Sequence, residues 1–298
     1  MNDLLNQSNT SASMQDNAQT ISMEQMPSLP LLLGKAAFKS GTYRLGDVLP
    51  KLEVRVGQLQ LDSDHVQRYR DVCGFTSNRI PATYLFVIAF PLFIRIMLDK
   101  DFPLRAMGQV HLRNKITVHS PIPIDCPLSV CASVGSADLT SRGLEWNIDT
   151  TVEAKGQLVW SSQSTFLYRC NTQIKPQPIV KTSPSGNFQQ WSFSADMGRR
   201  YAWISGDFNP IHLTNTSAKL LGFKRAIAHG MLSKARCLAA LDSMIPDADF
   251  AVDVGFHKPL FLPSTVQLYS QQLNSGHQFS LFNSSASQMH LEGAITQE

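Results

Sequence analysis

The chain consists of two diverged copies of one pattern, and this internal repeat is what most limits the folds it can adopt. The stretch YRDVCGF at residues 69–75 matches YAWISGD at residues 201–207. The stretch IPATYLFVIAF at residues 80–90 matches IAHGMLSKARC at residues 227–237. In each half an extended region with a proline-bearing turn follows the second stretch. The repeat therefore predicts two similar units, each with a central helix followed by strands.

The strands predicted after the two helices support this reading. Within residues 143–169 two alternating runs flank a Lys155-Gly156 turn, which is a strong signal for a β-hairpin. In the first half we expect strands near residues 108–119, 128–138, 143–154 and 158–169. In the second half we expect them near residues 251–257, 265–273, 278–283 and 289–295. The predicted class is α+β, with a helix laid across a curved antiparallel sheet in each half. Two such sheets can pair edge to edge, which removes two exposed edges.

The composition narrows the classes of function. The 298 residues are 43% hydrophobic and 16% charged, which is typical of one large or two ordinary globular domains. A net charge of +3 does not indicate a nucleic-acid partner. The five cysteines form no CxxC pair, which favours structural thiols in a reduced, cytoplasmic protein. The sequence contains no GxGxxG, Walker, HExxH or GxSxG motif, so we expect neither a metal nor a redox or nucleotide cofactor, and no serine hydrolase.

Composition also divides the chain into segments. Residues 1–28 are rich in Asn, Ser, Gln and Thr without a basic or apolar core, which predicts a disordered tail and neither a signal peptide nor an anchor. Residues 171–187 contain three prolines and no periodicity, which predicts a linker. The expected units are therefore an N-terminal repeat at 29–170 and a C-terminal repeat at 188–298. Residues 29–38 form either a short docking helix or a hydrophobic strap.

One apolar segment has to be distinguished from a membrane span. Residues 81–97, PATYLFVIAFPLFIRIM, are fewer than the roughly 20 that a span needs, and they contain Pro91 and Arg95. A helix that is apolar on nearly all sides fits the core of a soluble fold better.

Residues 201–231 carry the chemistry of the chain. Gly206 ends a short helical pattern, and the turn formers Asp207, Asn209 and Pro210 follow it. Pro210 fixes its own φ and biases Asn209 toward extended geometry. Asp207 and His212 therefore lie at opposite ends of a rigid loop and can face one point.

A carboxylate beside an imidazole is an acid/base pair, which contributes roughly 10²–10⁴ in rate when it is within hydrogen-bond reach. Gly230 begins the next helical run, where a backbone N–H is a ready donor to a developing oxyanion. Its lack of a side chain leaves room for a substrate carbonyl. These parts suit the addition of water across a double bond conjugated to a carbonyl, or the reverse reaction.

The order GDFNPIH, then GF, then IAHGM resembles the signature of the MaoC-like hydratase/dehydratase family. This family includes the R-specific enoyl-CoA hydratases and adopts the hot-dog fold. The resemblance implies that Asp207 and His212 hold and activate water, that Asn209 supports the loop, and that the Gly230 N–H binds the thioester oxygen. It also implies a double hot-dog chain, in which one catalytic half is paired with one degenerate half that gives room for long or bulky acyl groups.

The resemblance further implies an acyl thioester as substrate, with the pantetheine of CoA or of an acyl carrier protein as its only cofactor-like part. The residues expected against this substrate are His229, Lys224, Arg225, Phe208 and Met231. Lys224 and Arg225 can meet phosphate groups or can simply be solvated. The His229 ring can contact substrate or can only pack at the helix start.

The first half lacks the acid/base loop. Gly74 to Thr83 is nine positions, whereas Gly206 to Gly230 is twenty-four, so fifteen residues are missing there, including any counterpart of NPIH. Phe75 stands where Asp207 is expected. We therefore expect the N-terminal half to be non-catalytic. The side chains of its apolar helix that can line a cavity, or can serve only as core, are Leu85, Phe86, Ile88 and Phe93.

The residues and the resemblance together predict a hydratase/dehydratase of acyl thioesters, and the resemblance implies an R-3-hydroxyacyl product. Two alternatives stay open. A hot-dog acyl thioesterase would use Asp207 to direct water at the carbonyl carbon, and a non-catalytic protein would only bind acyl thioesters. The assignment of acid and base between Asp207 and His212 is also open, as are the acyl chain length, the direction of the reaction and the choice between a monomer and a homodimer.

Overall fold

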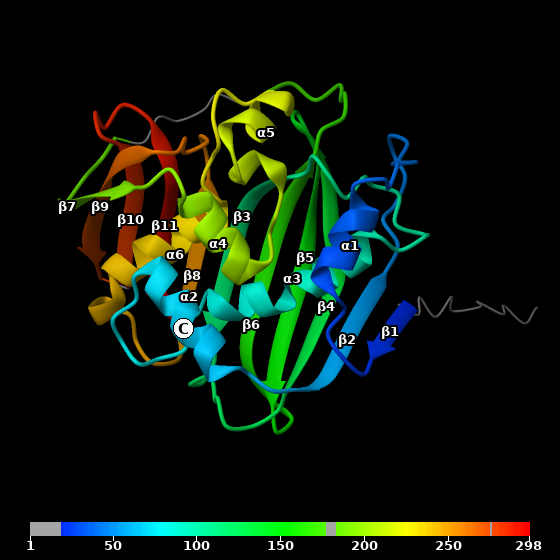
Figure 1. Ribbon diagram of the computed structural model, residues 1–298, viewed down its shortest axis with the longest axis horizontal. Coiled ribbons are helices and arrows are strands. Elements are labelled where there is room, and N and C mark those ends of the chain that lie inside the picture. The colour runs from blue at the N-terminus through cyan, green and yellow to red at the C-terminus, as the bar shows by residue number, and fades with distance from the viewer. Residues whose placement is uncertain (1–18, 177–182, 275) are drawn as a thin grey trace, which may run out of the picture.

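One sheet of eleven strands forms the back of the molecule (Figure 1). The computed structural model describes residues 19–176, 183–274 and 276–298. In the order in which they lie side by side, the strands are β1 (Gln19–Met23), β2 (Leu52–Leu59), β4 (Leu128–Thr140), β5 (Gly143–Ala154), β6 (Gln157–Tyr168), β3 (Val110–Val118), β8 (Phe250–Phe256), β11 (Met289–Gln297), β10 (Gly276–Asn283), β9 (Ser264–Leu273) and β7 (Asn187–Phe193). All neighbours are antiparallel except β1 and β2, which pair in parallel.

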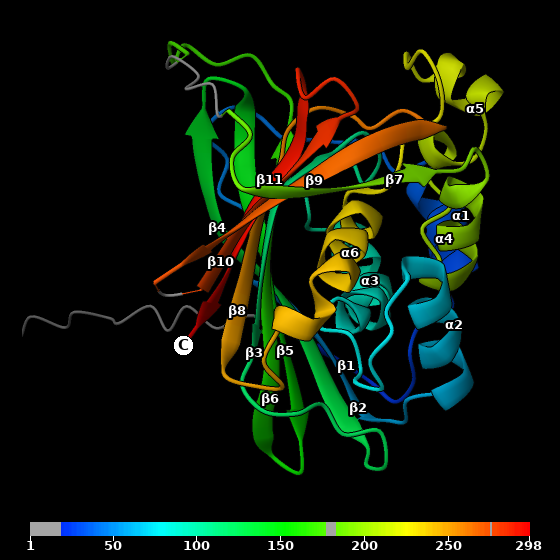
Figure 2. The ribbon, with the colours of Figure 1, turned by 90° about the vertical axis from the view of Figure 1, so that its left-hand side faces the viewer.

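The helices cover one face of this sheet (Figure 2). They are α1 (Leu29–Ala36), α2 (Ser63–Cys73), α3 (Tyr84–Met97), α4 (Met197–Ser205), α5 (Asn215–Leu220) and α6 (Gly230–Ala240), with the 3₁₀ turns η1 (Pro210–His212) and η2 (Asp242–Met244). The long helices α3 and α6 lie next to the sheet, and α2 and α4 lie outside them. The helix α3 is buried on nearly all sides, as its composition predicts. No helix in the described part of the chain is long and apolar enough to cross a membrane.

The two halves meet at the pairing of β3 with β8. This antiparallel register runs from Arg113 opposite Gly255 to Val118 opposite Phe250. The two predicted sheets are therefore joined edge to edge, and each half protects one edge of the other.

The helices α2 and α4, which correspond in the internal repeat, end in the same way. Gly74 follows α2 with a φ of 85°, and Gly206 follows α4 with a φ of 72°. Only glycine takes this left-handed conformation at little cost, which explains why both copies carry it. Tyr69 and Tyr201, one turn earlier in each copy, have ring centroids 6.2 Å apart. The internal repeat read from the sequence is thus visible in the structure.

A buried lysine fixes α6 to the joint between the halves. The Lys234 side chain is fully buried, and its Nζ donates to Asn114 O at 2.8 Å, Asn114 Oδ1 at 2.7 Å and Val252 O at 3.0 Å. Asn114 in turn donates to the hydroxyls of Ser162 and Ser164. Because these acceptors lie on β3 and β8, one side chain binds both strands at the joint. Burial lowers the pKa of Lys234 well below its usual value.

The segment expectations need one correction. Residues 19–23, predicted to belong to a disordered tail, form β1 because their backbone pairs with β2. The remainder of that tail, residues 1–18, lies outside the described residues, as do residues 177–182 of the predicted linker. The choice left open for residues 29–38 is settled in favour of a helix, α1. The strands β2 and β7 were not predicted.

Candidate active site

The loop after α4 is held by hydrogen bonds between its own residues. The Asp207 N–H donates to Ser205 Oγ at 3.2 Å, and Asp207 Oδ1 accepts from the Asn209 N–H at 3.1 Å. Asn209 Oδ1 accepts from the Ile211 N–H at 3.4 Å, which caps the 3₁₀ turn η1. Pro210, at the first position of η1, fixes the φ of the turn. The loop thus presents the Asp207 carboxylate from a defined backbone.

His212 closes the loop at the other end. Its ring is buried, and Nδ1–H donates to Ile227 O at 2.8 Å. This bond fixes the neutral tautomer, so Nε2 carries the lone pair. The backbone at His212 lies directly on α4, because a Cβ on Gly198 would overlap the His212 carbonyl oxygen. Only glycine at this position lets the loop approach so closely.

His229 lies between the two ends of the loop. Its Nε2–H donates to Asp207 O at 3.0 Å, and Nε2 is 3.9 Å from Asp207 Oδ2. The ring stacks on that of His212 with centroids 3.7 Å apart and an interplanar angle of 27°. Its Nδ1 is buried without a hydrogen-bond partner among the described residues, and so is the hydroxyl of Tyr201, whose ring centroid is 4.9 Å away.

The pKa values of both imidazoles are displaced in the same direction. Burial lowers the pKa of His212, although the Asp207 charge and the Ile227 carbonyl oppose the shift. Burial lowers the pKa of His229 still further, and the neighbouring His212 adds to this. Both rings are therefore neutral near pH 7. The Asp207 side chain is 29% exposed, so the acid is the part of the cluster that solvent reaches.

Gly230 supplies the start of α6, with His229 as its N-cap. A Cβ built on Gly230 would lie 3.2–3.4 Å from three atoms of the Phe256 ring on β8. The glycine is therefore enclosed between the histidines and an aromatic ring. The first N–H groups of a helix have no partner within the helix, so they are available to an oxygen of a ligand.

The structure separates the other expected contact residues into two groups. Met231 is buried at the start of α6, and Phe208 is half-buried with its ring edge on Trp203, at a centroid distance of 5.1 Å. Lys224 and Arg225 are exposed, and the Arg225 guanidinium lies 5.7 Å from the centroid of the Phe261 ring. Contact of these two cations with phosphate groups stays a prediction.

Asp207, His212 and His229 form a group that could in principle hold a cation, because their ligand atoms all lie within 4.8 Å of one another. The ring geometry does not favour this. A metal lies in the plane of each imidazole that binds it, but these two rings are stacked 3.7 Å apart and nearly parallel. The lone pairs therefore run beside one another and do not converge. The expectation of a metal-free reaction remains a prediction.

Several contributors to this cluster were missed at the level of sequence. Tyr201 precedes Gly206 in a short helical pattern, and an aromatic residue there carries no signal of a place in a catalytic cluster. Ile227 contributes a backbone carbonyl, for which no residue type is diagnostic. Ser205 anchors the Asp207 N–H through its hydroxyl, and in the aligned repeat its counterpart is Cys73.

A pocket lined by residues of both halves lies at the position of the N-terminal repeat that corresponds to the catalytic cluster. Its volume is about 240 Å³, and its walls include Phe75 and Ala82, the counterparts of Asp207 and His229 in the repeat. At this pocket Arg79 forms an ion pair with Asp242 at 2.8 Å. Phe75 and Ala82 thus stand where the other half has Asp207 and His229.

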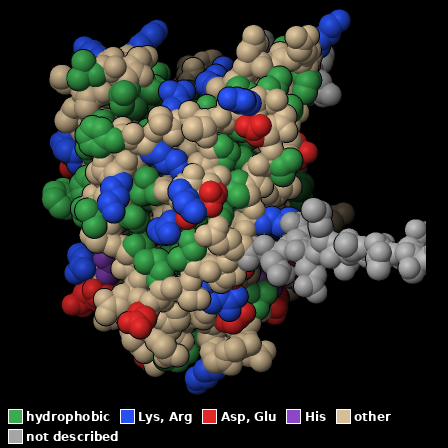
Figure 3. All heavy atoms as spheres, turned by 90° about the vertical axis from the view of Figure 1, so that its right-hand side faces the viewer, with side chains coloured by type: hydrophobic (Ala, Val, Ile, Leu, Met, Phe, Trp, Pro, Cys, Tyr) green, Lys and Arg blue, Asp and Glu red, His purple; other side chains and the backbone are tan. Residues whose placement is uncertain are grey.

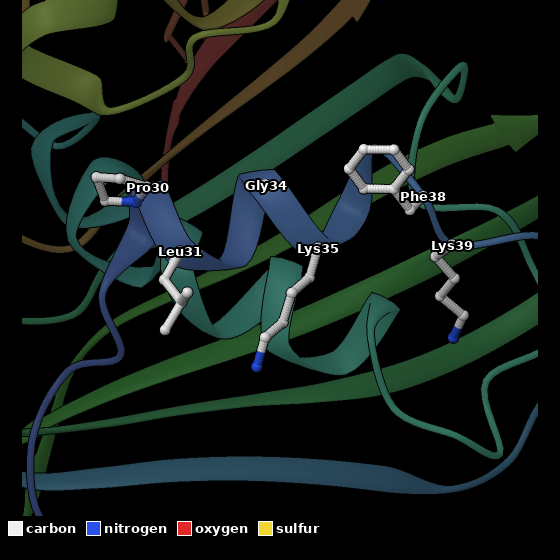
Figure 4. A pocket seen from close by; sticks show the side chains of 6 residues that line it. All are labelled: Pro30, Leu31, Gly34, Lys35, Phe38 and Lys39. Carbon is white, nitrogen blue, oxygen red and sulfur yellow. The ribbon is translucent and has the colours of Figure 1, made fainter.

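The outer surface of α1 carries a separate shallow groove of about 590 Å³ (Figure 4). Leu31 and Lys35 point away from the body of the protein there, and Phe38 is 90% exposed. On this side of the molecule hydrophobic side chains lie among Lys and Arg (Figure 3). The start of α1 also borders the catalytic loop, because a Cβ on Gly206 would overlap the Leu29 side chain.

Comparison with known proteins identifies the fold and the family. The family model described as the MaoC like domain matches residues 171–292. Over 278 residues the chain is 33% identical to 3-hydroxyacyl-thioester dehydratase X of Mycobacterium tuberculosis, covering 92% of this chain and 99% of that protein. The chain belongs to the MaoC-like dehydratase family. It is accordingly an enzyme, a hydro-lyase, and the resemblance read from GDFNPIH is confirmed.

Solved structures place this MaoC-like dehydratase among double hot-dog proteins, as predicted. The crystal structure of HtdX of Mycobacterium tuberculosis matches with a TM-score of 0.73 and 32% identity, covering 83% of this chain and 100% of that chain. A MaoC-like dehydratase of Phytophthora capsici matches with a TM-score of 0.66 and 19% identity, covering 84% and 97%. The second likeness supports the fold alone.

Proposed function

We propose that this hydro-lyase adds water to, or removes it from, the 2,3 position of an acyl thioester, interconverting trans-2-enoyl and R-3-hydroxyacyl forms. The observation that carries the proposal is the meeting of the Asp207 carboxylate, the neutral His212 ring and the free start of α6 in one cluster. The name of the mycobacterial relative, a 3-hydroxyacyl-thioester dehydratase, supports the substrate class.

In the hydration direction, His212 Nε2 takes a proton from a water molecule that the Asp207 carboxylate holds through its other O–H. The water oxygen bonds to C3 as the C2=C3 π bond breaks, and the electron pair moves toward the thioester oxygen. The Gly230 N–H faces that oxygen and stabilises its developing charge. The imidazolium, stabilised by the nearby carboxylate, then returns its proton to C2. In the dehydration direction the same steps run in reverse.

The remaining residues have supporting roles in this proposal. Asn209 holds the loop through its bonds to Asp207 and Ile211, and His229 keeps the loop against α6. Phe208 and Met231 would contact the acyl thioester, and the exposed Lys224 and Arg225 would meet phosphates of its carrier. We propose that the N-terminal repeat, 29–170, is non-catalytic and that the 171–187 linker joins it to the catalytic repeat, 188–298.

We propose no cofactor beyond the pantetheine arm of the substrate, which either CoA or an acyl carrier protein can supply. The fused repeats already form the sheet pairing between β3 and β8. A monomer is therefore sufficient for the reaction, and a homodimer of the fused chain is equally compatible with it. We place this activity in the cytoplasm and in fatty acid metabolism.

The direct test follows the absorbance of the conjugated enoyl thioester while the protein acts on trans-2-enoyl-CoAs of short, medium and long chain. We expect the absorbance to fall without release of free thiol, and chiral analysis to identify the R-3-hydroxyacyl product. Release of thiol would identify a thioesterase instead. If neither signal changes with CoA or carrier-protein thioesters, the proposal is wrong.

Replacing Gly230 by Ala should slow hydration by about tenfold to a hundredfold, since oxyanion donors lose effect when displaced. The added methyl would press on the Phe256 ring and shift the start of α6. Stability should change little, because Ala is a better helix former than Gly. The matched control is Gly34→Ala on α1, where a Cβ meets no atom within 4 Å. Equal rates for the two variants in the enoyl-CoA assay would contradict the assigned role.

The rate should stay constant as the pH is lowered to 6.5 and should fall only in more acidic solution. The base must be neutral, and the pKa of His212 is lowered from 6.5, so the neutral form persists below that pH. The stability of the fold should change with pH in the same direction. The histidines of the unfolded chain have the higher pKa values and are protonated first, so the contribution of the neutral His212 and His229 to stability is present above about pH 6.5 and is lost as the pH falls. A pH profile of kcat/KM checks this, and an acid limb centred above 6.5 would contradict it.

A further inference from the structure

One imidazole of the N-terminal half has no assigned role. His111 lies on β3, at the point where the pairing with β6 shifts register between His111 and Arg113. Its ring stacks between Phe166, at a centroid distance of 4.7 Å, and Phe86, at 5.6 Å, and it is tilted against Phe256 at 5.1 Å. We call Phe86, His111, Phe166 and Phe256 the aromatic cluster.

The aromatic cluster adjoins the catalytic groups. The Phe256 ring is the one that a Cβ on Gly230 would touch at 3.2–3.4 Å, so a single ring separates His111 from the start of α6. Burial, the main cause, and the Lys234 charge lower the pKa of His111 to about 3, although a hydrogen bond with the Arg113 backbone and the Asp207 charge oppose this shift. The ring is therefore neutral at any working pH.

One ring nitrogen of His111, Nε2, is buried in this cluster without a hydrogen-bond partner among the described residues. A phenylalanine would fill the same space between Phe86 and Phe166 without leaving a polar atom unsatisfied. The position therefore carries a hydrogen-bonding group that packing alone does not require.

We propose that His111 is a substrate-contacting residue supplied by the N-terminal half, and that its Nε2 hydrogen-bonds a polar group on the acyl chain of the thioester. The inference rests on the proposed function. Phe256 packs against both His111 and the start of α6, so His111 lies one aromatic ring away from the position proposed for the thioester oxygen. A hydroxyl fits either tautomer of the ring, because it both donates and accepts.

The specificity follows from the same unpaired atom. A plain alkyl chain would leave Nε2 without a partner in a desolvated site, whereas a hydroxylated chain would satisfy it. Sites built to bond a polar group reject analogues that lack it. The enzyme should therefore prefer hydroxylated acyl chains, and the preference should depend on the position of the hydroxyl along the chain.

The test compares pairs of trans-2-enoyl-CoAs of equal length, with and without one hydroxyl on a carbon between C5 and C8. For one position we expect the wild-type kcat/KM to favour the hydroxylated member by about tenfold, the effect of one neutral hydrogen bond. His111→Phe keeps the ring stack but removes the nitrogen, so it should abolish or invert this preference. His111→Gln should retain part of it.

The matched control is His290→Phe. His290 is also buried with an unpartnered Nε2, and its Nδ1–H donates to Lys258 O at 3.0 Å. This variant should keep the wild-type preference, whereas an equal change in both variants would attribute the effect to packing and would overturn the inference.

Calorimetry of the binding of the corresponding saturated acyl-CoAs distinguishes a failure of the proposed hydratase function from a failure of the proposed His111 contact. These ligands cannot be hydrated, so a hydroxyl preference that His111→Phe removes supports the contact even if hydration fails. The inference is wrong if hydration proceeds with no preference for the hydroxylated member in either assay, or if His111→Phe weakens both members of a pair equally. In either case His111 does not bind a polar group on the acyl chain.

Discussion

Asp207→Asn and His212→Ala should each lower kcat/KM for enoyl-thioester hydration by about 10²–10⁴-fold, the range that a positioned acid or base supplies. An amide at position 207 can still accept the Asn209 N–H at 3.1 Å through its oxygen, so the loop should keep its shape. What it loses is the charge that holds water and stabilises the imidazolium. Replacing His212 by Ala removes the proposed base, the ring whose neutral tautomer is fixed by the bond to Ile227 O.

The measurement is the enoyl-CoA absorbance assay, with thermal unfolding of each variant to verify the fold. Because the two groups act on one water molecule, the double variant should be little slower than either single one. Asp71→Asn, an exposed aspartate of α2 that accepts from Gln67, provides the control and should retain the wild-type rate. Hydration within tenfold of wild type in Asp207→Asn would remove the carboxylate from the mechanism.

Lys234→Met should lower the free energy of unfolding by about 3 kcal/mol or more, since each buried acceptor left unsatisfied costs roughly 1–3 kcal/mol. The methionine side chain has nearly the length of lysine and would fill most of the same buried space, so the change is mainly the loss of three hydrogen bonds to Asn114 and Val252. Both strands at the joint between the halves lose a partner at once. The destabilisation should therefore affect the whole molecule.

Urea unfolding of the variant measures this loss, with Lys219→Met as its partner. Lys219 is exposed on α5, where a similar change should stay within about 0.5 kcal/mol. A loss below 1 kcal/mol for Lys234→Met would show that water or a shift of the helix satisfies the three oxygens.

The elements that sequence predicts best are those with local signals. The strands β3 to β6 and β8 to β11 alternate or are bounded by turns such as Lys155-Gly156, which the structure places in left-handed geometry with φ of 51° and 74°. By contrast, β7 is exposed along most of its length and shows no apolar alternation. The strand β1 exists only through its pairing with β2, more than thirty residues away in the chain. No local pattern marks either strand.

The same distinction applies to the catalytic cluster. Asp207 and His212 lie five positions apart, so turn chemistry alone indicates that they face each other. The contact of Phe256 with both His111 and Gly230 depends on the pairing of the two half-sheets through β3 and β8, and no spacing in the sequence predicts it. Lys224 and Arg225 are only a few residues before His229 and are exposed, so their contact with phosphate groups stays a prediction.

The pocket lined by Phe75 and Ala82 has a kinetic consequence. An assembly of two identical repeats has twin catalytic centres, and such twins can communicate, so that occupation of one changes the affinity of the other. In this chain the second position is a pocket whose wall carries Phe75 in place of the acid and an ion pair between Arg79 and Asp242. With one catalytic centre per polypeptide, as proposed, a monomer is expected to saturate with a Hill coefficient of about one. The two repeats can then diverge separately, because only one of them carries the acid/base loop.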